Sequence, residues 1–150
     1  MIILFGSRLA KFNYGTFMNS DQKKNLILAL ETSGRYGSVA IGSEGEVIVE
    51  KQFSAPMKHS SEIFPAIKSL LKSLTKAHQD ITEVYISQGP GSFTGLRIAV
   101  TLAKAMHLAD NSIKIVAVDT LDCIAQNTEQ YINAEKQQIN RIGVILDAKR

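Results

Sequence analysis

A glycine-rich run between two apolar segments is the feature that most restricts how this chain can fold. It reads Gly-Pro-Gly-Ser-Phe-Thr-Gly-Leu-Arg at residues 89–97, and it follows a short strand-like segment at residues 83–87. It leads into a nearly all-apolar segment, residues 94–109, which has the length and spacing of a helix. Small residues in such a connection let the backbone turn tightly and approach a neighbour closely. The sequence therefore predicts a strand–turn–helix unit with the glycines at the turn.

Three further strands are predicted before this unit. Residues 26–30 form a continuous apolar run, typical of a strand that is buried on both faces. Residues 39–41 belong to a second, alternating strand, and residues 47–53 form a more polar third strand that should lie near a sheet edge. A tight turn at residues 43–46 offers Gly45 for a positive φ. Consecutive strands joined by short turns predict an antiparallel meander.

Helical spacing then alternates with strand patterns. Residues 63–74 carry apolar side chains at helical spacing with lysines opposite, and Ser60 or Ser61 is expected to cap this helix. Pro65 is expected within or next to its first turn. Later segments predict a strand at 113–118, a helix at about 120–131 and the start of a strand at 142–146.

This order predicts an α/β fold of ribonuclease-H-like topology. The expected sheet is mixed: a three-strand antiparallel meander is joined by parallel strands, with helices on both faces. We expect an N-terminal extension at residues 1–24, a lobe at residues 25–132, and a linker with the first strand of a truncated second lobe at residues 133–150. The extension is too briefly apolar for a signal peptide, and Met18 is an alternative start. No segment is long and apolar enough to predict a membrane span.

Composition narrows the functional classes. The 150 residues carry a net charge of +3, but the lysines and arginines are scattered, and aromatic residues make up only 7% with no tryptophan. Stand-alone RNA binding is therefore not favoured. The single cysteine, Cys123, excludes an intramolecular disulfide, suits a reducing cytoplasm, and is interpreted as a small core residue.

Metal-dependent and nucleophilic chemistry find little support. The histidines are far apart in sequence, and Ile63 stands where a helical ligand partner of His59 would be. No catalytic residue, metal ligand or cofactor is expected. The glycine spacing matches neither common nucleotide-binding pattern, so a structural turn is favoured over a phosphate site. Weak candidates for cofactor binding are Glu31, Thr32, Ser33, Gly89 and Gly91.

The segment after the glycine loop suggests an additional contact. Gly95, Ala99 and Ala103 follow one another at four-residue steps and form a small-residue stripe along the predicted helix. Such a stripe lets another helix approach closely, and a helix that is apolar nearly all round needs cover on several sides. Burial within the lobe and contact with a partner subunit both account for this pattern.

These residues also carry a family resemblance. Residues 86–98 closely match the signature of the TsaB (YeaZ) family, and three collinear matches lie at residues 28–33, at 59–65 and at 146–150. The chain thus resembles the N-terminal lobe of this two-lobed family, which is related to the TsaD or glycoprotease (peptidase M22-like) proteins. The resemblance implies an actin-like ATPase (ASKHA) lobe.

The resemblance further implies a non-catalytic, cytoplasmic subunit of the complex that forms threonylcarbamoyladenosine next to the anticodon of tRNA. Its implied partners are a TsaD-like catalytic subunit and a TsaE-like ATPase, with tRNA reached through the complex and no membrane involved. TsaD carries a metal-binding His-x-x-x-His, which this chain lacks. In the family, the first two helices contact TsaD, or form a homodimer without it. On this sequence the implied interface residues are Ile63, Ile67, Leu70, Leu74, Gly95, Leu96, Ala99, Ala103 and Met106.

Two other functions stay open at this point. An actin-like ATPase or a glycoprotease-type metalloenzyme would have its own activity, which metal content and ATP turnover would reveal. Direct tRNA binding would show in a salt-dependent gel-shift assay.

Overall fold

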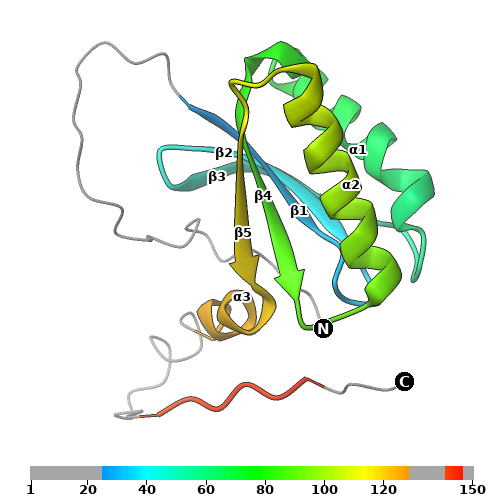
Figure 1. The fold of residues 1–150 in the computed structure, drawn as a ribbon, viewed down its shortest axis with the longest axis vertical. Coiled ribbons are helices and arrows are strands. Elements are labelled where there is room, and N and C mark those ends of the chain that lie inside the picture. Colours follow the sequence, from blue (N-terminus) through cyan, green and yellow to red (C-terminus); the bar gives the residue numbers. More distant parts are fainter. Residues whose placement is uncertain (1–24, 129–140, 147–150) are drawn as a thin grey trace.

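A computed structural model describes residues 25–128 and 141–146, which contain one five-stranded sheet and its helices (Figure 1). The predicted extension at residues 1–24 lies outside the described residues. The elements in chain order are β1 (Leu26–Glu31), β2 (Ser38–Ser43), β3 (Glu46–Gln52), α1 (His59–Ser73), the short 3₁₀ helix η1 (His78–Asp80), β4 (Ile81–Gly89), α2 (Phe93–Ala109), β5 (Lys114–Asp119) and α3 (Thr120–Gln126).

The sheet has the mixed topology that the sequence predicts. Its strand order is β3-β2-β1-β4-β5. The meander β1-β2-β3 is antiparallel, whereas β4 runs parallel to both β1 and β5. Helical connections between the parallel strands account for this arrangement, since parallel neighbours need a crossover. The predicted α/β fold class is confirmed.

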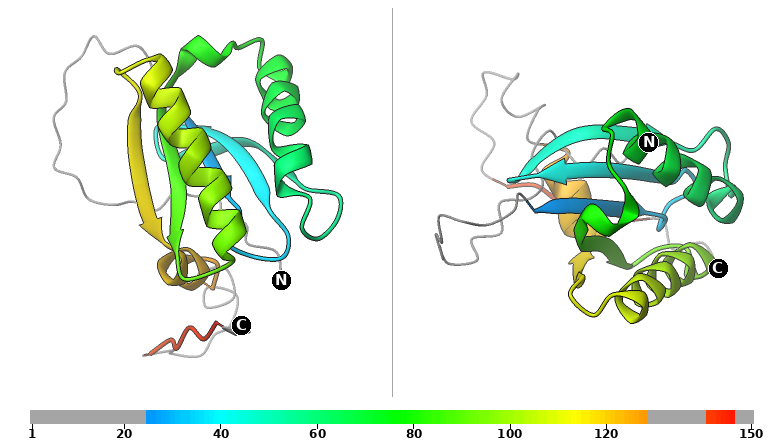
Figure 2. Two further views of the ribbon diagram at one scale, coloured as in Figure 1. Left: turned by 45° about the vertical axis from the view of Figure 1, so that its right-hand side comes forward. Right: turned by 90° about the horizontal axis from the view of Figure 1, so that it is seen from above.

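The two faces of the sheet are covered differently. Helices α1 and α2 lie side by side over one face (Figure 2), where they bury Leu28 and Leu30 of β1 in the main core. Ile27 and Ala29 alternate with these residues and belong to a smaller cluster on the opposite face. Glu31, two residues after Ala29, points to the same face as Ile27 and Ala29. Its charge acts on Cys123 of α3, so α3 lies towards this second face.

The turn between β2 and β3 takes the expected hairpin form. Glu44 and Gly45 both have positive φ, at 54° and 83°. Positive φ at two central residues matches the twist of antiparallel strands. Gly45 therefore occupies the position that the sequence assigns to it.

The start of α1 differs from the prediction. The helix begins at His59, with Lys58 at the N-cap and no side-chain capping bond, so neither Ser60 nor Ser61 caps it. His59 is buried with its Nε2 at 3.1 Å from the Gly34 carbonyl oxygen, which ties the first turn to the β1–β2 connection. Pro65 consequently lies inside the helix rather than near its first turn.

The C-terminal part also differs in one respect. Helix α3 ends at Gln126, and residues 141–146 have no regular secondary structure, so the strand predicted at 142–146 is not formed. Ile145 is 93% exposed. A strand needs a neighbouring strand for its hydrogen bonds, and none pairs with this segment within the described residues. No described helix is long and apolar enough to cross a membrane.

Ser54 controls the titration of a carboxylate at the start of α1. Glu62 accepts hydrogen bonds from Ser54 N at 2.7 Å and from Ser54 Oγ at 2.5 Å. These bonds, the side-chain bond first, lower the pKa of Glu62 from 4.5. Because the pKa is lower in the folded state, the stabilisation is present above pH 4.5 and is lost as pH falls through the folded value.

Substitution of Ser54 should therefore shift this titration. In the variant Ser54→Ala, we expect the pKa of Glu62, followed by NMR, to rise towards 4.5 because the largest lowering contribution is gone. Ser112→Ala is the matched control, since Ser112 lowers the pKa of Asp110 in the same way and does not contribute to that of Glu62. An unchanged Glu62 titration in Ser54→Ala would contradict this assignment.

Candidate protein-interaction surface

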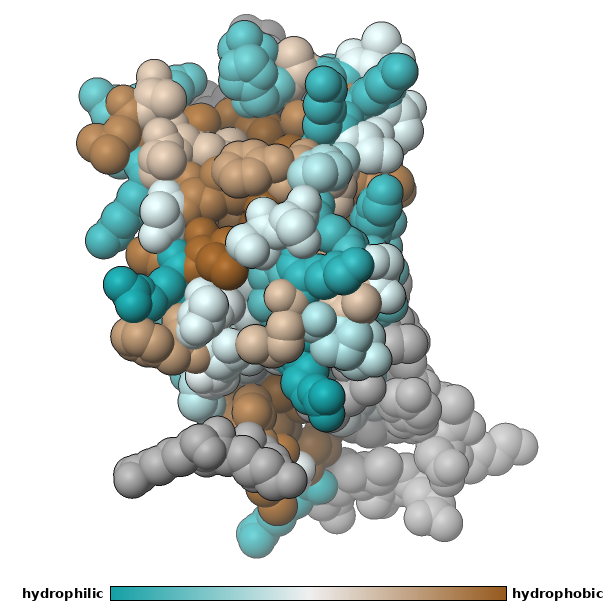
Figure 3. Space-filling model, turned by 90° about the vertical axis from the view of Figure 1, so that its right-hand side faces the viewer, coloured by the Kyte–Doolittle hydropathy of each residue, from teal (hydrophilic) through white to brown (hydrophobic). Residues whose placement is uncertain are grey.

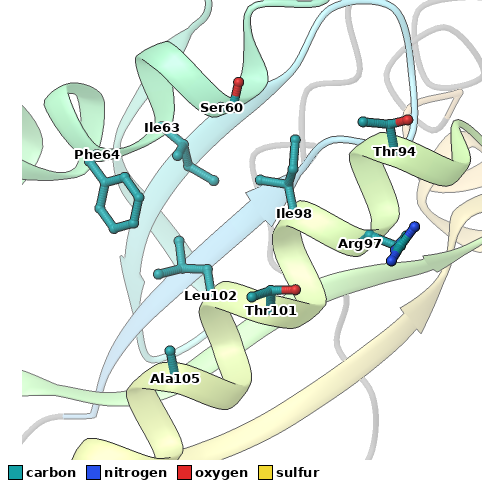
Figure 4. Close-up of a pocket in the computed structure, with 9 residues that line it drawn as sticks. All are labelled: Ser60, Ile63, Phe64, Thr94, Arg97, Ile98, Thr101, Leu102 and Ala105. Carbon is teal, nitrogen blue, oxygen red and sulfur yellow. The ribbon is translucent and has the colours of Figure 1, made fainter.

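A groove lies between α1 and α2 on the surface of the described residues. It encloses about 410 Å³. Ile63 and Phe64 of α1 face Ile98 and Leu102 of α2 across it (Figure 4). The full lining consists of Ser60, Ile63, Phe64, Thr94, Arg97, Ile98, Thr101, Leu102 and Ala105.

The small-residue stripe explains why α2 presents larger side chains to this groove. Gly95, Ala99 and Ala103 are all buried. A Cβ on Gly95 would overlap the Thr32 carbonyl oxygen, so this face of α2 lies directly against the end of β1. Because the stripe faces the sheet, Ile98 and Leu102 are turned towards α1 and only partly buried.

One exposed aromatic ring lines the groove, and a second contacts a lining residue. Phe64 is 62% exposed and Phe93 is 72% exposed. The Arg97 guanidinium carbon lies 5.0 Å from the centroid of the Phe93 ring, within the range of a cation–π contact. Figure 3 shows apolar side chains gathered on this face between more hydrophilic borders. Arg97 is the charged member of the lining, so the groove suits an apolar partner with an acidic group.

The interface residues implied by the family resemblance divide into two groups. Ile63 lines the groove although it is only 1% exposed, and Ile67, Leu74, Leu96 and Met106 are half-buried. The others lie in the core. They are Leu70, Gly95, Ala99 and Ala103, whose burial leaves little surface for a partner, and a partner contact through them stays a prediction.

Several groove residues were missed by that assignment. Ile98, Leu102 and Ala105 recur at helical spacing beside the small-residue stripe, and Thr94 and Thr101 extend the same face. This second stripe was visible in the sequence. In α2 the smallest residues lie against the sheet, which leaves larger ones turned towards α1.

The glycine loop packs against the end of β1. Thr32 Oγ1 donates to the Gly95 carbonyl oxygen at 2.7 Å, and Ser92 N donates to the Ser33 carbonyl oxygen at 2.6 Å. A Cβ on Gly91 would lie 2.6 Å from Ser33 Cβ, so a side chain there would collide. The structure thus brings Gly91 against Ser33, as a tight structural turn requires.

The five weak cofactor candidates occupy this packed region. Glu31, Thr32 and Ser33 are at most 4% exposed. Their polar groups bond to one another, to Ser87 or to the glycine loop. Gly89 is buried with φ of 112°, and Gly91 is exposed.

Reactive groups are sparse in the described part of the chain. No group of three or more His, Cys, Asp or Glu side chains there could hold a metal ion. Burial, followed by the charge of Glu31, raises the pKa of Cys123 to about 12. The thiol is therefore protonated at neutral pH, and its burial agrees with the interpretation of Cys123 as a core residue.

Comparison with known proteins shows which family the chain resembles. The family model "TsaD: tRNA N6-adenosine threonylcarbamoyltransferase" matches residues 45–150. The tRNA threonylcarbamoyladenosine biosynthesis protein TsaB of Bacillus subtilis is 36% identical over 124 residues, which cover 83% of this chain and 51% of that protein. The chain belongs to the TsaB (YeaZ) family. The TsaB of Buchnera aphidicola from Acyrthosiphon pisum is 33% identical, with coverage of 77% and 55%.

A solved structure supports the same membership in the TsaB family. YeaZ from Pseudomonas aeruginosa superposes with a TM-score of 0.64 at 30% identity, covering 71% of this chain and 50% of that one. The chain thus spans about half the length of the TsaB relatives that it matches. The TsaD-like family model and these neighbours also support the actin-like assignment of the lobe.

Proposed function

We propose that this chain is the N-terminal lobe of a non-catalytic scaffold subunit in tRNA threonylcarbamoyladenosine formation. In this proposal the groove between α1 and α2 binds a TsaD-like catalytic subunit. The modified adenosine lies next to the anticodon, and tRNA is reached through the complex. A TsaE-like ATPase completes the set of partners.

The observation that carries the proposal is the apolar groove with the exposed Phe64 ring in its lining. Phe64 is a large, exposed apolar side chain that lines the groove, and the exposed Phe93 ring lies next to it in the structure through its contact with Arg97, which also lines the groove. Aromatic and arginine side chains dominate the binding energy of many protein interfaces. Arg97, which contacts Phe93, adds a cation to the same surface. These are features of a surface that binds protein.

The proposal is tested by filling the groove. Ala105 is exposed and lines the groove, so Ala105→Arg would place a long charged side chain in it without disturbing the core. We expect the affinity for a TsaD-like subunit to fall about tenfold or more, because the docked apolar surface would meet a charge. Complex mass and titration of the purified proteins measure this effect.

Ala109→Arg is the matched control. Ala109 is the exposed last residue of α2 and does not line the groove, so the same substitution there should leave the affinity unchanged. Failure of the unsubstituted chain to bind a TsaD-like subunit would refute the scaffold proposal. Equal loss of affinity in both variants would refute the choice of surface. A complex of two copies of this chain that persists in the presence of a TsaD-like subunit would indicate that the groove serves self-association instead.

A further inference from the structure

We infer that the buried carboxylate of Glu31 is a positioning residue that fixes the N-terminal turn of α2. Glu31 ends β1 and is fully buried. It lies on the sheet face that points towards α3, whereas α2 covers the other face. The carboxylate nevertheless holds the turn on which α2 begins, through a short chain of hydrogen bonds.

The first step of this chain is the set of donors around the carboxylate. Oε1 accepts from Ser33 N at 2.6 Å and from Ser33 Oγ at 2.5 Å. Oε2 accepts from the hydroxyl of Ser87, which lies on the neighbouring strand β4. All three residues are at most 4% exposed. Hydrogen bonds to a buried carboxylate are stronger than those between neutral groups, so this cluster fixes the backbone at Ser33 relative to β4.

The second step joins Ser33 to the start of α2. The Ser33 carbonyl oxygen accepts from Ser92 N at 2.6 Å. Ser92 is the N-cap of α2, and its Oγ accepts from Gly95 N at 3.3 Å. The neighbouring Thr32 donates its hydroxyl to the Gly95 carbonyl oxygen at 2.7 Å. The turn that Glu31 holds therefore contacts both the cap and the first turn of the helix.

The third step is the close packing of the glycine loop against Ser33. A Cβ on Gly91 would lie 2.6 Å from Ser33 Cβ and 2.7 Å from the Ser33 carbonyl oxygen. Because the loop fits so closely, a displacement of Ser33 must displace the loop as well. The exposed pair Phe93 and Arg97 stands on the turn fixed in this way. Any effect of this turn on the binding of a partner through Phe93 and Arg97 rests on the proposed function. The positioning role of Glu31 does not, because it concerns contacts within this chain.

Amide hydrogen exchange within a single helix tests this role. In Glu31→Ala we expect the amides of Ser92 and Gly95 to exchange about tenfold faster or more, because their acceptors lose the fixed turn. The amide of Asp110, bonded to the Met106 carbonyl oxygen at 2.9 Å at the far end of α2, should change much less. Ser87→Ala keeps the donors from Ser33 and should give a smaller change of the same pattern.

Two further variants separate positioning from general loss of stability. Glu31→Gln should retain slow exchange, since its amide oxygen can accept from Ser33 and its amino group can donate to the Ser87 hydroxyl. Val84→Ala, a cavity at a fully buried position of β4, should speed exchange equally at both ends of α2. Unchanged Ser92 exchange in Glu31→Ala would overturn the inference, as would exchange in Glu31→Gln as fast as in Glu31→Ala. If Glu31→Ala does not fold, wild-type Ser92 exchange in Ser87→Ala overturns it.

Discussion

Replacing Gly95 with alanine is expected to destabilise the lobe by about 3 kcal/mol or more, although alanine is the better helix former. Intrinsic helix propensity alone favours alanine over glycine by about 1 kcal/mol. The added Cβ would overlap the Thr32 carbonyl oxygen, which is backbone at the end of a buried strand and cannot move aside cheaply. The clash therefore outweighs the propensity. Denaturant unfolding of the purified variant measures the change in the free energy of unfolding.

Gly45→Ala is the control for this prediction. Gly45 has φ of 83°, but nothing lies within 4 Å of the position that its Cβ would take. Only the conformational cost remains there, about 1–2 kcal/mol. A Gly95→Ala variant as stable as the unsubstituted chain would show that α2 does not lie directly against β1. A larger loss at Gly45 than at Gly95 would likewise contradict the order of effects.

The general fold could be predicted because local pattern and tertiary environment agree over most of the chain. The uninterrupted apolar run at residues 26–30 predicts a strand buried on both faces, and β1 is the central strand with such burial. The more polar third strand is β3, which lies at a sheet edge. The apolar segment is buried in the centre of the sheet and the polar segment lies at its solvent-exposed edge, so composition predicts both positions.

Predictions of local structure were less successful where that structure depends on contacts with other parts of the fold. The start of α1 is set by His59, which is buried against Gly34 and Phe53, rather than by a serine cap. Tertiary packing outweighs the local capping preference there. Residues 141–146 have strand-like composition but no partner within the described residues, so composition alone does not produce a strand. In the first case the deciding contact joins residues distant in sequence, and in the second no pairing contact is formed within the described residues.

The two helices chosen from the sequence line the groove, but most of the individual residues chosen do not. Both α1 and α2 were chosen from the sequence, and both line the groove. The choice of face on α2 could not be made from periodicity, since the helix is apolar nearly all round. What decides the face is size: Gly95 fits against the Thr32 carbonyl oxygen and a larger residue does not. Phe93 and Arg97, outside the small-residue stripe, are exposed instead.

Enlarging Ala99 distinguishes these two faces directly. If the small-residue stripe received a partner helix, Ala99→Leu would weaken binding and leave the lobe stable. Ala99 is fully buried in the main core, so we expect the variant to lose about 1–3 kcal/mol of stability through overpacking. The same change at Ala105, which is exposed on the same helix, should alter stability by less than about 0.5 kcal/mol.

Thermal or denaturant unfolding of both variants, together with their binding to a TsaD-like subunit, gives the answer. A stable Ala99→Leu chain with impaired binding would indicate that the partner contacts the small-residue stripe. A destabilised Ala99→Leu chain beside a stable Ala105→Leu chain would confirm that the stripe packs on the sheet. Because both substitutions add the same side chain to the same helix, helix propensity is equal in the two and only the surroundings differ. The comparison therefore isolates packing as the reason that α2 turns one face inward and leaves the other for a partner.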